Sequence, residues 1–221
     1  MRALISASLL AADRAQLGQE AKRMEEAGVD RLHIDVMDGH YVPQITWGAW
    51  VLEALRLWSS LPMDVHLMVE EPQVLPYIRA GAQSITFHPK TSSNPEGVLQ
   101  RIKAAGCQAG LAISPLDDFM SWPSLWWSLC DCITLMSVKP GMGGQSFLPQ
   151  TSSRLQTVRS KLPPIPVWVD GGITPLTAKQ VAGAALLVSG SFLFSASSPK
   201  EAVMALREGA HEASKFSHGI K

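Results

Sequence analysis

Residues 32–43 read LHIDVMDGHYVP, an apolar run with β-strand character that ends in polar residues and a glycine turn. Successive side chains of a β-strand alternate between its two faces, so His33, Asp35 and Met37 are predicted to point the same way. Burying a carboxylate is unfavourable unless it is paired or holds a cation. Two explanations follow from this stretch alone. It forms either a His–Asp pair that satisfies itself in a core or part of a metal site completed elsewhere.

The same pattern, a short apolar run followed by a polar end and a helical segment, recurs along the whole chain. Capping residues such as Asp13, Asn94, Thr174 and Ser198 begin several of the helical segments, and glycine ends many of them. Eight apolar runs are recognised, at residues 3–8, 31–36, 63–68, 84–88, 109–113, 132–138, 167–169 and 186–189.

Strands that alternate with helices pair in parallel, and eight such units in 221 residues predict a TIM (β/α)8 barrel. We expect one barrel domain over residues 1–221, because no linker or change of composition marks a second domain. An open doubly wound sheet is the alternative, but no glycine fingerprint follows the first apolar run.

The composition limits the class of protein. Hydrophobic residues make up 46% of the chain and charged residues 17%, which predicts a large buried core. The 19 basic and 19 acidic side chains balance, and no basic run or cationic amphipathic helix occurs, so we expect neither a nucleic-acid nor a membrane partner. The first residues, MRALISASLLAAD, fit a first strand better than a signal peptide.

The chain has three cysteines, Cys107, Cys130 and Cys132. An odd number does not make a disulfide framework, and Cys130 with Cys132 lacks a second ligand pair at zinc-finger spacing. We expect buried, reduced thiols and a cytoplasmic location. Trp122, Trp126 and Trp127 are predicted to pack on the barrel, with self-association as the alternative, and we expect a homo-oligomer.

Functional residues of such barrels lie at the C-terminal ends of the strands. His33 and Asp35 close the second run, His66 lies in the third and Asp170 follows the seventh, so all four are predicted to meet at one level. Two imidazoles and two carboxylates suit a divalent ion such as Zn²⁺, Fe²⁺, Mn²⁺ or Co²⁺. Each of these residues alone could be a buried polar residue that makes all its hydrogen bonds within the core. Four of them at equivalent strand ends favour a metal centre.

The last three strand ends are rich in glycine. Glycine allows backbone amides to approach an anion, and the loops after the last strands are the usual phosphate position of this fold. The glycine-rich positions are Gly141, Gly143 and Gly144 after the sixth run, Gly171 and Gly172 after the seventh, and Gly190 with Ser191 after the eighth. They predict a phosphate site.

Six segments resemble signature blocks of the ribulose-phosphate 3-epimerase family, in order and through essentially the whole chain. They read ISASLLAAD, LHIDVMDGHYVPQITWG, DVHLMV, SVKPGMGGQSF, VDGGIT and VSGS. The resemblance implies an enzyme with a TIM-barrel fold and a divalent metal, and it implies that this enzyme acts on a sugar phosphate. It implies that His33, Asp35, His66 and Asp170 bind the metal and that Asp35 and Asp170 form the acid/base pair.

The resemblance also implies a set of substrate contacts. These are Ser8, His66, Gly141, Met142, Gly143, Gly144, Gly171, Gly172, Gly190 and Ser191. Met37, Met68 and Met136 close three strands near the same level and form either a thioether shell around an enediolate or ordinary core packing.

The chain departs from the family pattern at Ser137, Lys139, Met142, Ala185 and the Pro-Lys pair after His88. None of these positions belongs to the predicted ligand or acid/base set, so the departures leave the choice of substrate open. Lys139 either extends the cationic reach toward the phosphate or is a solvated loop residue. His40 and His88 are predicted to make only local hydrogen bonds.

The sequence therefore predicts a metal-dependent 3-epimerase that interconverts D-ribulose 5-phosphate and D-xylulose 5-phosphate through an enediolate. One alternative is a 3-epimerase of a hexulose 6-phosphate or another pentulose phosphate. Another is a phosphate-binding decarboxylase or isomerase, although an inward lysine beside an aspartate at a strand end is missing. A non-catalytic sugar-phosphate binder is disfavoured by the intact set of two aspartates and two histidines.

Overall fold

The computed structural model describes residues 2–216 and contains a closed barrel of eight parallel strands in sequence order. β8 pairs with β1 and closes the ring, which confirms the TIM barrel and excludes the doubly wound sheet. The strands are β1 (Leu4–Ser8), β2 (Arg31–Met37), β3 (Met63–Met68), β4 (Ser84–Phe87), β5 (Gln108–Ile113), β6 (Cys132–Met136), β7 (Val167–Asp170) and β8 (Leu186–Ser189).

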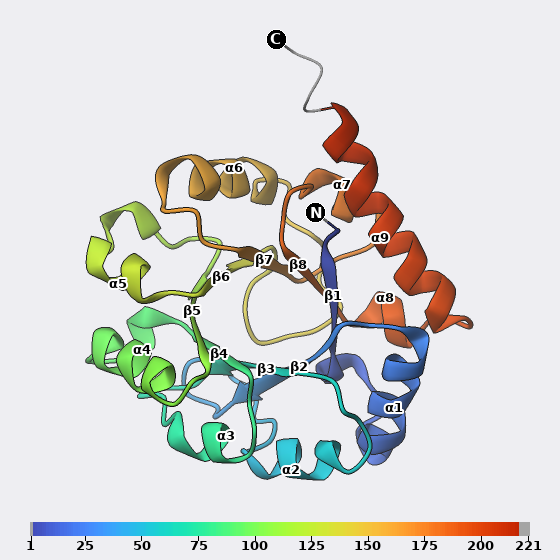
Figure 1. Cartoon of the computed structure of the whole chain (residues 1–221), viewed down its shortest axis with the longest axis horizontal. Helices are drawn as coiled ribbons and strands as arrows, with labels where there is room; N and C mark the ends of the chain where they lie inside the picture. The colour runs from blue at the N-terminus through green and yellow to red at the C-terminus, as the bar shows by residue number, and fades with distance from the viewer. Residues whose placement is uncertain (1, 217–221) are drawn as a thin grey trace.

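Helices surround the barrel as an outer ring (Figure 1). They are α1 (Leu17–Ala27), α2 (Trp50–Arg56), α3 (Leu75–Arg79), α4 (Pro95–Ala104), α5 (Ser124–Leu129), α6 (Thr151–Lys161), α7 (Pro175–Gln180), α8 (Ser191–Phe194) and α9 (Pro199–Phe216). No helix among residues 2–216 combines the length and the apolar character needed to cross a membrane.

Local capping signals explain where several helices begin. The Asn94 side chain accepts a hydrogen bond from the Gly97 amide at the start of α4, and Thr174 forms a capping box with Thr177 at α7. Asp13 caps a short 3-10 helix ahead of α1 and not α1 itself. α3 begins at Leu75, shortly after Glu71, whose amide donates to the carbonyl of Thr91.

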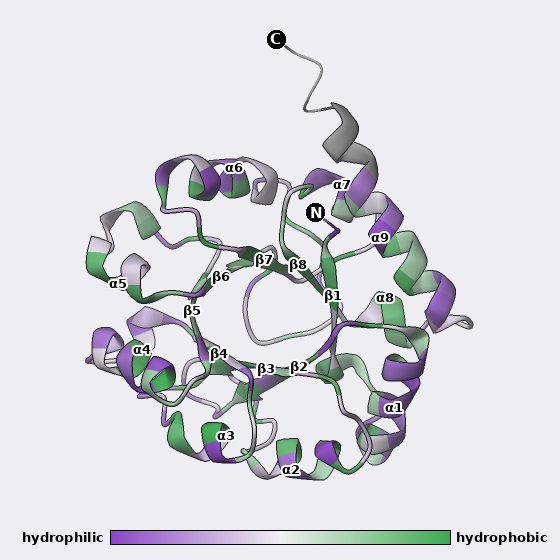
Figure 2. Ribbon diagram, in the orientation of Figure 1, coloured by the Kyte–Doolittle hydropathy of each residue, from purple (hydrophilic) through white to green (hydrophobic). Residues whose placement is uncertain are grey.

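The core lies between the barrel and the helices, with apolar strand residues inside and polar helix faces outside (Figure 2). Trp127 is buried in this core and stacks on Trp122 with ring centroids 5.4 Å apart, so these tryptophans do pack on the barrel. Cys130 and Cys132 are buried as expected, and burial raises the pKa of the Cys130 thiol to about 12. Cys107 is only half-buried.

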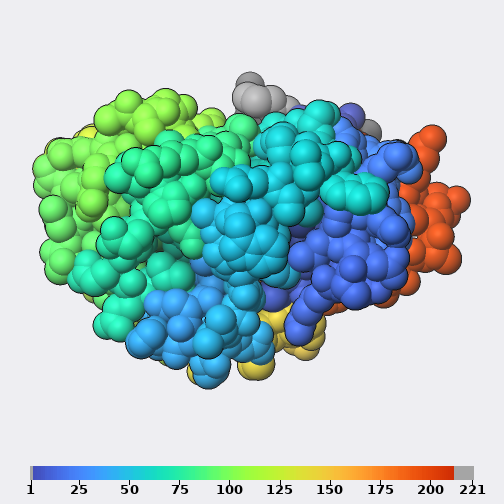
Figure 3. Space-filling view, turned by 90° about the horizontal axis from the view of Figure 1, so that it is seen from below, coloured from blue at the N-terminus to red at the C-terminus, as the bar shows by residue number. Residues whose placement is uncertain are grey.

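The loops that follow the strands gather at one end of the barrel. Figure 3 shows the loop after β6, in yellow, emerging at the same end of the molecule as blue residues that follow β2. The two loops touch, because a Cβ atom on Gly141 would lie 2.8 Å from the Cβ atom of Val42. This end carries the predicted functional residues.

Candidate active site and metal centre

Four buried side chains from three strands meet at the loop end of the barrel. One ligand atom from each of His33, Asp35, His66 and Asp170 lies within 4.8 Å of those of the other three. Asp35 and His66 are Cα partners in the β2–β3 ladder, so their side chains leave the sheet side by side. β7 extends one residue further than predicted and presents Asp170 as its last residue.

The imidazoles turn one nitrogen each toward both carboxylates. His33 Nε2 lies 3.3 Å from Asp35 Oδ1 and 3.6 Å from Asp170 Oδ2. His66 Nδ1 lies 3.4 Å and 3.6 Å from the same two oxygens. Among the described residues neither nitrogen has a hydrogen-bond partner, although both atoms are fully buried.

Two unsatisfied nitrogens that face two carboxylates fit a divalent cation. A buried polar atom without a partner is unfavourable by about 1–3 kcal/mol, and a cation at the centre of the cluster would accept both lone pairs. Borderline ions prefer a mixed nitrogen and oxygen donor set of this kind. The cluster could therefore hold a metal ion.

The second nitrogen of each imidazole has a partner that the sequence analysis missed. His33 Nδ1 lies 2.5 Å from Asp64 Oδ2, and Asp64 in turn accepts a hydrogen bond from the Ser6 hydroxyl. His66 Nε2 lies 2.9 Å from His88 Nε2, which corrects the expectation that His88 makes only local hydrogen bonds. Asp64 is the Cα partner of His33, so only the strand register could have identified it.

Charge and burial oppose each other within the cluster. Burial lowers the pKa of His33, but the carboxylates of Asp35, Asp64 and Asp170 outweigh it and raise that pKa well above its usual value. Burial lowers the pKa of His66 as well, but the nearby carboxylates of Asp170 and Asp35 outweigh it and raise that pKa. Burial would raise the pKa of Asp35, yet the two imidazoles bring it far below its usual range.

His88 behaves in the opposite way. Burial lowers the pKa of His88 well below its usual value, and the nearby positive charges of His66 and Lys90 act in the same direction. His88 is therefore neutral beside a histidine whose pKa is raised.

A pocket of about 570 Å³ opens directly above the cluster. Asp35 and Asp170 line it, whereas His66 is fully buried and is not among the described lining residues, so the predicted substrate contact of His66 stays a prediction. The other predicted contacts all line the pocket: Ser8, Gly141, Met142, Gly143, Gly144, Gly171, Gly172, Gly190 and Ser191. Met37, Met68 and Met136, all buried, line it as well.

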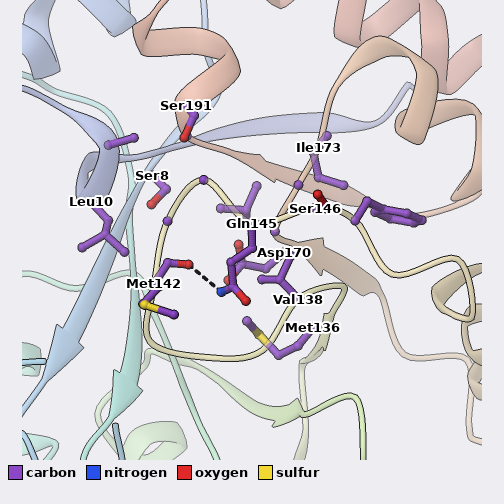
Figure 4. Close-up of a pocket in the computed structure, with 18 of the residues that line it drawn as sticks. Ser8, Leu10, Met136, Val138, Met142, Gln145, Ser146, Asp170, Ile173 and Ser191 are labelled. Carbon is purple, nitrogen blue, oxygen red and sulfur yellow. Dashed lines mark hydrogen bonds between the residues drawn. The ribbon is translucent and has the colours of Figure 1, made fainter. Parts of the chain in front are cut away.

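Side chains converge on this pocket from opposite sides (Figure 4). The Ser8 hydroxyl donates to Asp35 Oδ2 at 2.7 Å and thereby orients that carboxylate. The Ser137 hydroxyl donates to the Asp170 carbonyl at 2.8 Å and holds the end of β7 in place.

The loop after β6 forms one wall of the pocket. The Gln145 amide donates to the carbonyls of Lys139 at 2.6 Å and Met142 at 2.8 Å, which folds the glycine segment into a compact turn (Figure 4). Gly172 has φ +61°, and a Cβ atom there would lie 2.7 Å from the Phe147 amide nitrogen. Only glycine permits this close approach between the loops after β6 and β7. Lys139 is exposed and lines the pocket.

Solved structures with low sequence identity share this fold. A 3-hexulose-6-phosphate synthase aligns with a TM-score of 0.66 at 19% identity, covering 95% of this chain and 99% of that chain. A thiamine phosphate pyrophosphorylase from Pyrococcus furiosus aligns with a TM-score of 0.64 at 15% identity, covering 96% of each chain. At these identities the likeness supports the barrel alone.

Sequence comparisons are far more specific. A ribulose-phosphate 3-epimerase of Mycobacterium tuberculosis (strain H37Rv) is 42% identical, over 96% of this chain and 94% of its own. The ribulose-phosphate 3-epimerase of Escherichia coli (strain K12) is 41% identical, over 97% of this chain and 98% of its own. The model of the Ribulose-phosphate 3 epimerase family matches residues 4–194, a span that holds the four-residue cluster and every residue predicted to contact substrate. The chain therefore belongs to the ribulose-phosphate 3-epimerase family.

Proposed function

We propose that this protein is a metal-dependent 3-epimerase that interconverts D-ribulose 5-phosphate and D-xylulose 5-phosphate. The observation that carries the proposal is the buried cluster of two imidazoles and two carboxylates at the floor of the pocket. The names of relatives at 41–42% identity support the pentulose phosphate as the substrate.

Epimerisation at carbon 3 removes a proton beside the carbonyl group and returns one from the opposite face. A planar enediolate needs an acid/base group on each face, because one side chain cannot easily serve both. Asp35 on β2 and Asp170 on β7 both line the pocket and approach it from strands three places apart in the ring. One carboxylate takes the proton from carbon 3 while the other, protonated, delivers a proton to the other face.

The surroundings of Asp35 keep its carboxylate ionised, the state that a base requires. The Ser8 hydroxyl donates to its Oδ2 atom, while the imidazoles of His33 and His66 lower its pKa. In the reaction direction in which Asp35 is the base, it therefore starts the cycle as a carboxylate. In the reverse direction the roles of the two carboxylates exchange, as microscopic reversibility requires.

His33, Asp35, His66 and Asp170 would hold the divalent metal, which we infer to be Zn²⁺, Fe²⁺, Mn²⁺ or Co²⁺ from the donor set. When bound, it supplies Lewis-acid stabilisation of the negative charge that develops on the substrate oxygens, worth several kcal/mol. Met37, Met68 and Met136 bring apolar, polarisable side chains to the pocket and limit the water around the reacting carbons.

The glycine loops would bind the phosphate group. Backbone amides of Gly143 and Gly144, of Gly171 and Gly172, and of Gly190 and Ser191 are the donors proposed for its oxygens. Lys139 adds a cation at the edge of the same pocket, which supports a dianionic ligand.

A coupled assay against several ketose phosphates tests the proposal. We expect turnover of D-ribulose 5-phosphate to exceed that of a hexulose 6-phosphate, and deuterium from solvent to enter carbon 3 of the product. Preferred turnover of the hexulose 6-phosphate would move the proposal to the alternative substrate. Binding of every sugar phosphate without turnover would identify a non-catalytic binder.

We also infer a cytoplasmic homo-oligomer. Ile45 and Leu116 (79% and 96% exposed) are apolar, lie in loops at the same end of the barrel, and support burial against another copy. Analytical ultracentrifugation of the full chain at micromolar concentration tests the assembly, and a purely monomeric species would contradict it.

A further inference from the structure

We propose that His88 is a positioning residue of the metal centre, which fixes the proton of His66 on Nε2 through a neutral hydrogen-bond relay to Ser114 and Tyr41. The inference rests on one part of the proposed function, namely that the cluster binds a divalent metal. It assigns a role to a buried histidine that belongs to neither the ligand set nor the acid/base pair.

The relay is continuous and mostly buried. His66 Nε2 lies 2.9 Å from His88 Nε2, His88 Nδ1 lies 3.1 Å from Ser114 Oγ, and Ser114 Oγ lies 3.1 Å from the Tyr41 hydroxyl. His66 and His88 are fully buried and Ser114 is 5% exposed, so water does not compete for these hydrogen bonds. Four separate segments of the chain, around β3, β4, β5 and the loop after β2, contribute one member each.

The geometry allows only one direction for the protons when a metal is bound. His66 must present the lone pair of Nδ1 to the cluster, so its proton sits on Nε2 and points at His88. The Nε2 atom of His88 must then accept, which places the His88 proton on Nδ1 and directs it at Ser114. Ser114 in turn donates to the oxygen of Tyr41. A second proton on His88 would leave the N···N contact without an acceptor.

The far end of the relay is held in place by Asp117 and Lys90. Asp117 accepts a hydrogen bond from the Ser114 amide at 2.7 Å and one from Lys90 at 3.1 Å. Lys90 lies 5.3 Å from the ring centroid of Tyr41. Lys90, two residues after His88, thus supplies the cation that packs over the last member of the relay.

The two imidazoles of the cluster have unlike partners. His33 is backed by the carboxylate of Asp64, one of the usual partners of a metal-bound histidine, and a carboxylate makes an imidazole more basic. His66 is backed by a neutral imidazole, which fixes the proton but adds no negative charge. On the side away from the cluster, the acceptor for the His66 proton is therefore His88.

Two conservative variants separate this role from simple packing. In His88→Gln, the side-chain oxygen is separated from Cα by the same number of bonds as Nε2 of histidine. It can therefore accept the hydrogen bond from His66 Nε2. In His88→Asn the amide reaches only the Nδ1 position and can contact Ser114 but not His66. Exposed His40, which pairs with Asp38, provides the matched control His40→Asn.

The affinity of the metal-free protein for Zn²⁺, measured by chelator competition, is the main readout. We expect His88→Asn to weaken binding by about 10–100-fold, the usual effect of losing the partner of a metal-bound histidine, and His88→Gln to remain within about threefold of wild type. His40→Asn should leave the affinity unchanged. Histidine ¹⁵N NMR of the zinc-loaded protein should show the His66 proton on Nε2 in wild type and in His88→Gln.

Wild-type affinity in His88→Asn would overturn the proposal, as would an equal loss in both His88 variants together with an equal fall in Tm. Neither readout requires turnover. A wild-type protein that binds Zn²⁺ but does not epimerise D-ribulose 5-phosphate would therefore contradict the proposed function while leaving the test of His88 intact.

Discussion

The floor of the pocket, formed by Asp35 and Asp170 with His33 and His66 behind them, is made of side chains that regular strands hold in register, whereas its rim is made of backbone in irregular loops. On the floor, His33, Asp35, His66 and Asp170 are between 0% and 8% exposed, and each projects from a paired strand. On the rim, Gly143 and Gly144 are exposed and offer only their peptide groups. The chemistry of the floor therefore depends on which side chains are present, and binding at the rim depends on which backbone conformations are possible.

The largest expected effect comes from removing a charge on the floor. Asp35→Asn and Asp170→Asn should each lower kcat by about a thousandfold or more, because each loses an acid/base group and a proposed metal ligand. Steady-state assays with D-ribulose 5-phosphate measure the loss, and circular dichroism checks that the fold persists. Glu26→Gln, at an exposed ion pair of α1, is the control. A loss below tenfold in either aspartate variant would contradict the assignment.

Metal uptake by the floor should depend strongly on pH. The raised pKa values of His33 and His66 mean that the metal-free protein retains protons that a cation must displace. The apparent affinity for Zn²⁺ should therefore rise with pH, by up to about tenfold per pH unit for each displaced proton, until the raised pKa values are passed. Calorimetric titrations in buffers of different ionisation enthalpy count the protons released.

The metal-free protein should show the opposite trend in stability. A histidine whose pKa is raised on folding stabilises the fold below the pKa of the unfolded chain, about 6.5, and that contribution is lost as pH rises through the folded value. The Tm of metal-free protein should thus fall as pH increases above 6.5. A Tm that rises over this range, with no proton release on metal binding, would remove the electrostatic account of the floor.

The glycine positions of the rim should respond to changes of backbone conformation. Gly172→Ala puts a side chain at φ +61° and against the Phe147 amide, a strain of about 1–3 kcal/mol that should displace the loop after β6. We expect KM for the sugar phosphate to rise about tenfold or more while metal affinity stays unchanged. Gly143→Ala, where no heavy atom lies within 4 Å of the added Cβ, should have a smaller effect. Equal effects of the two variants would show that backbone strain is not what matters.

The smallest effect is expected from the methionines beneath the rim. Met68 packs with Met37 and Val42 in a small apolar cluster and is 2% exposed. Met68→Leu conserves volume and should change the free energy of unfolding by less than about 1.5 kcal/mol. If the methionines act only as packing, kcat should stay within about threefold of wild type. A larger fall in kcat at unchanged stability would favour a polarisable shell around the enediolate.

Sequence patterns predicted the floor better than the partners behind it. The alternation in residues 32–43 and the polar residues that close other strands brought out all four members of the cluster, because strand alternation is a local property. The same patterns missed Asp64 and assigned His88 to local hydrogen bonds. Asp64 meets His33 through the β2–β3 register, and His88 meets His66 from the neighbouring strand β4. Neither contact has a signature in one strand alone.

By itself the sequence determined the eight strand–helix units, the barrel they form and the residue types at the strand ends, since periodicity and capping act over a few neighbouring residues. Only the tertiary structure decided which nitrogen of each imidazole faces the carboxylates, which group backs the other nitrogen, and how closely the loops after β6 and β7 approach each other. These contacts join segments far apart in the chain. Their geometry depends on closure of the ring and on strand register, which no local pattern encodes.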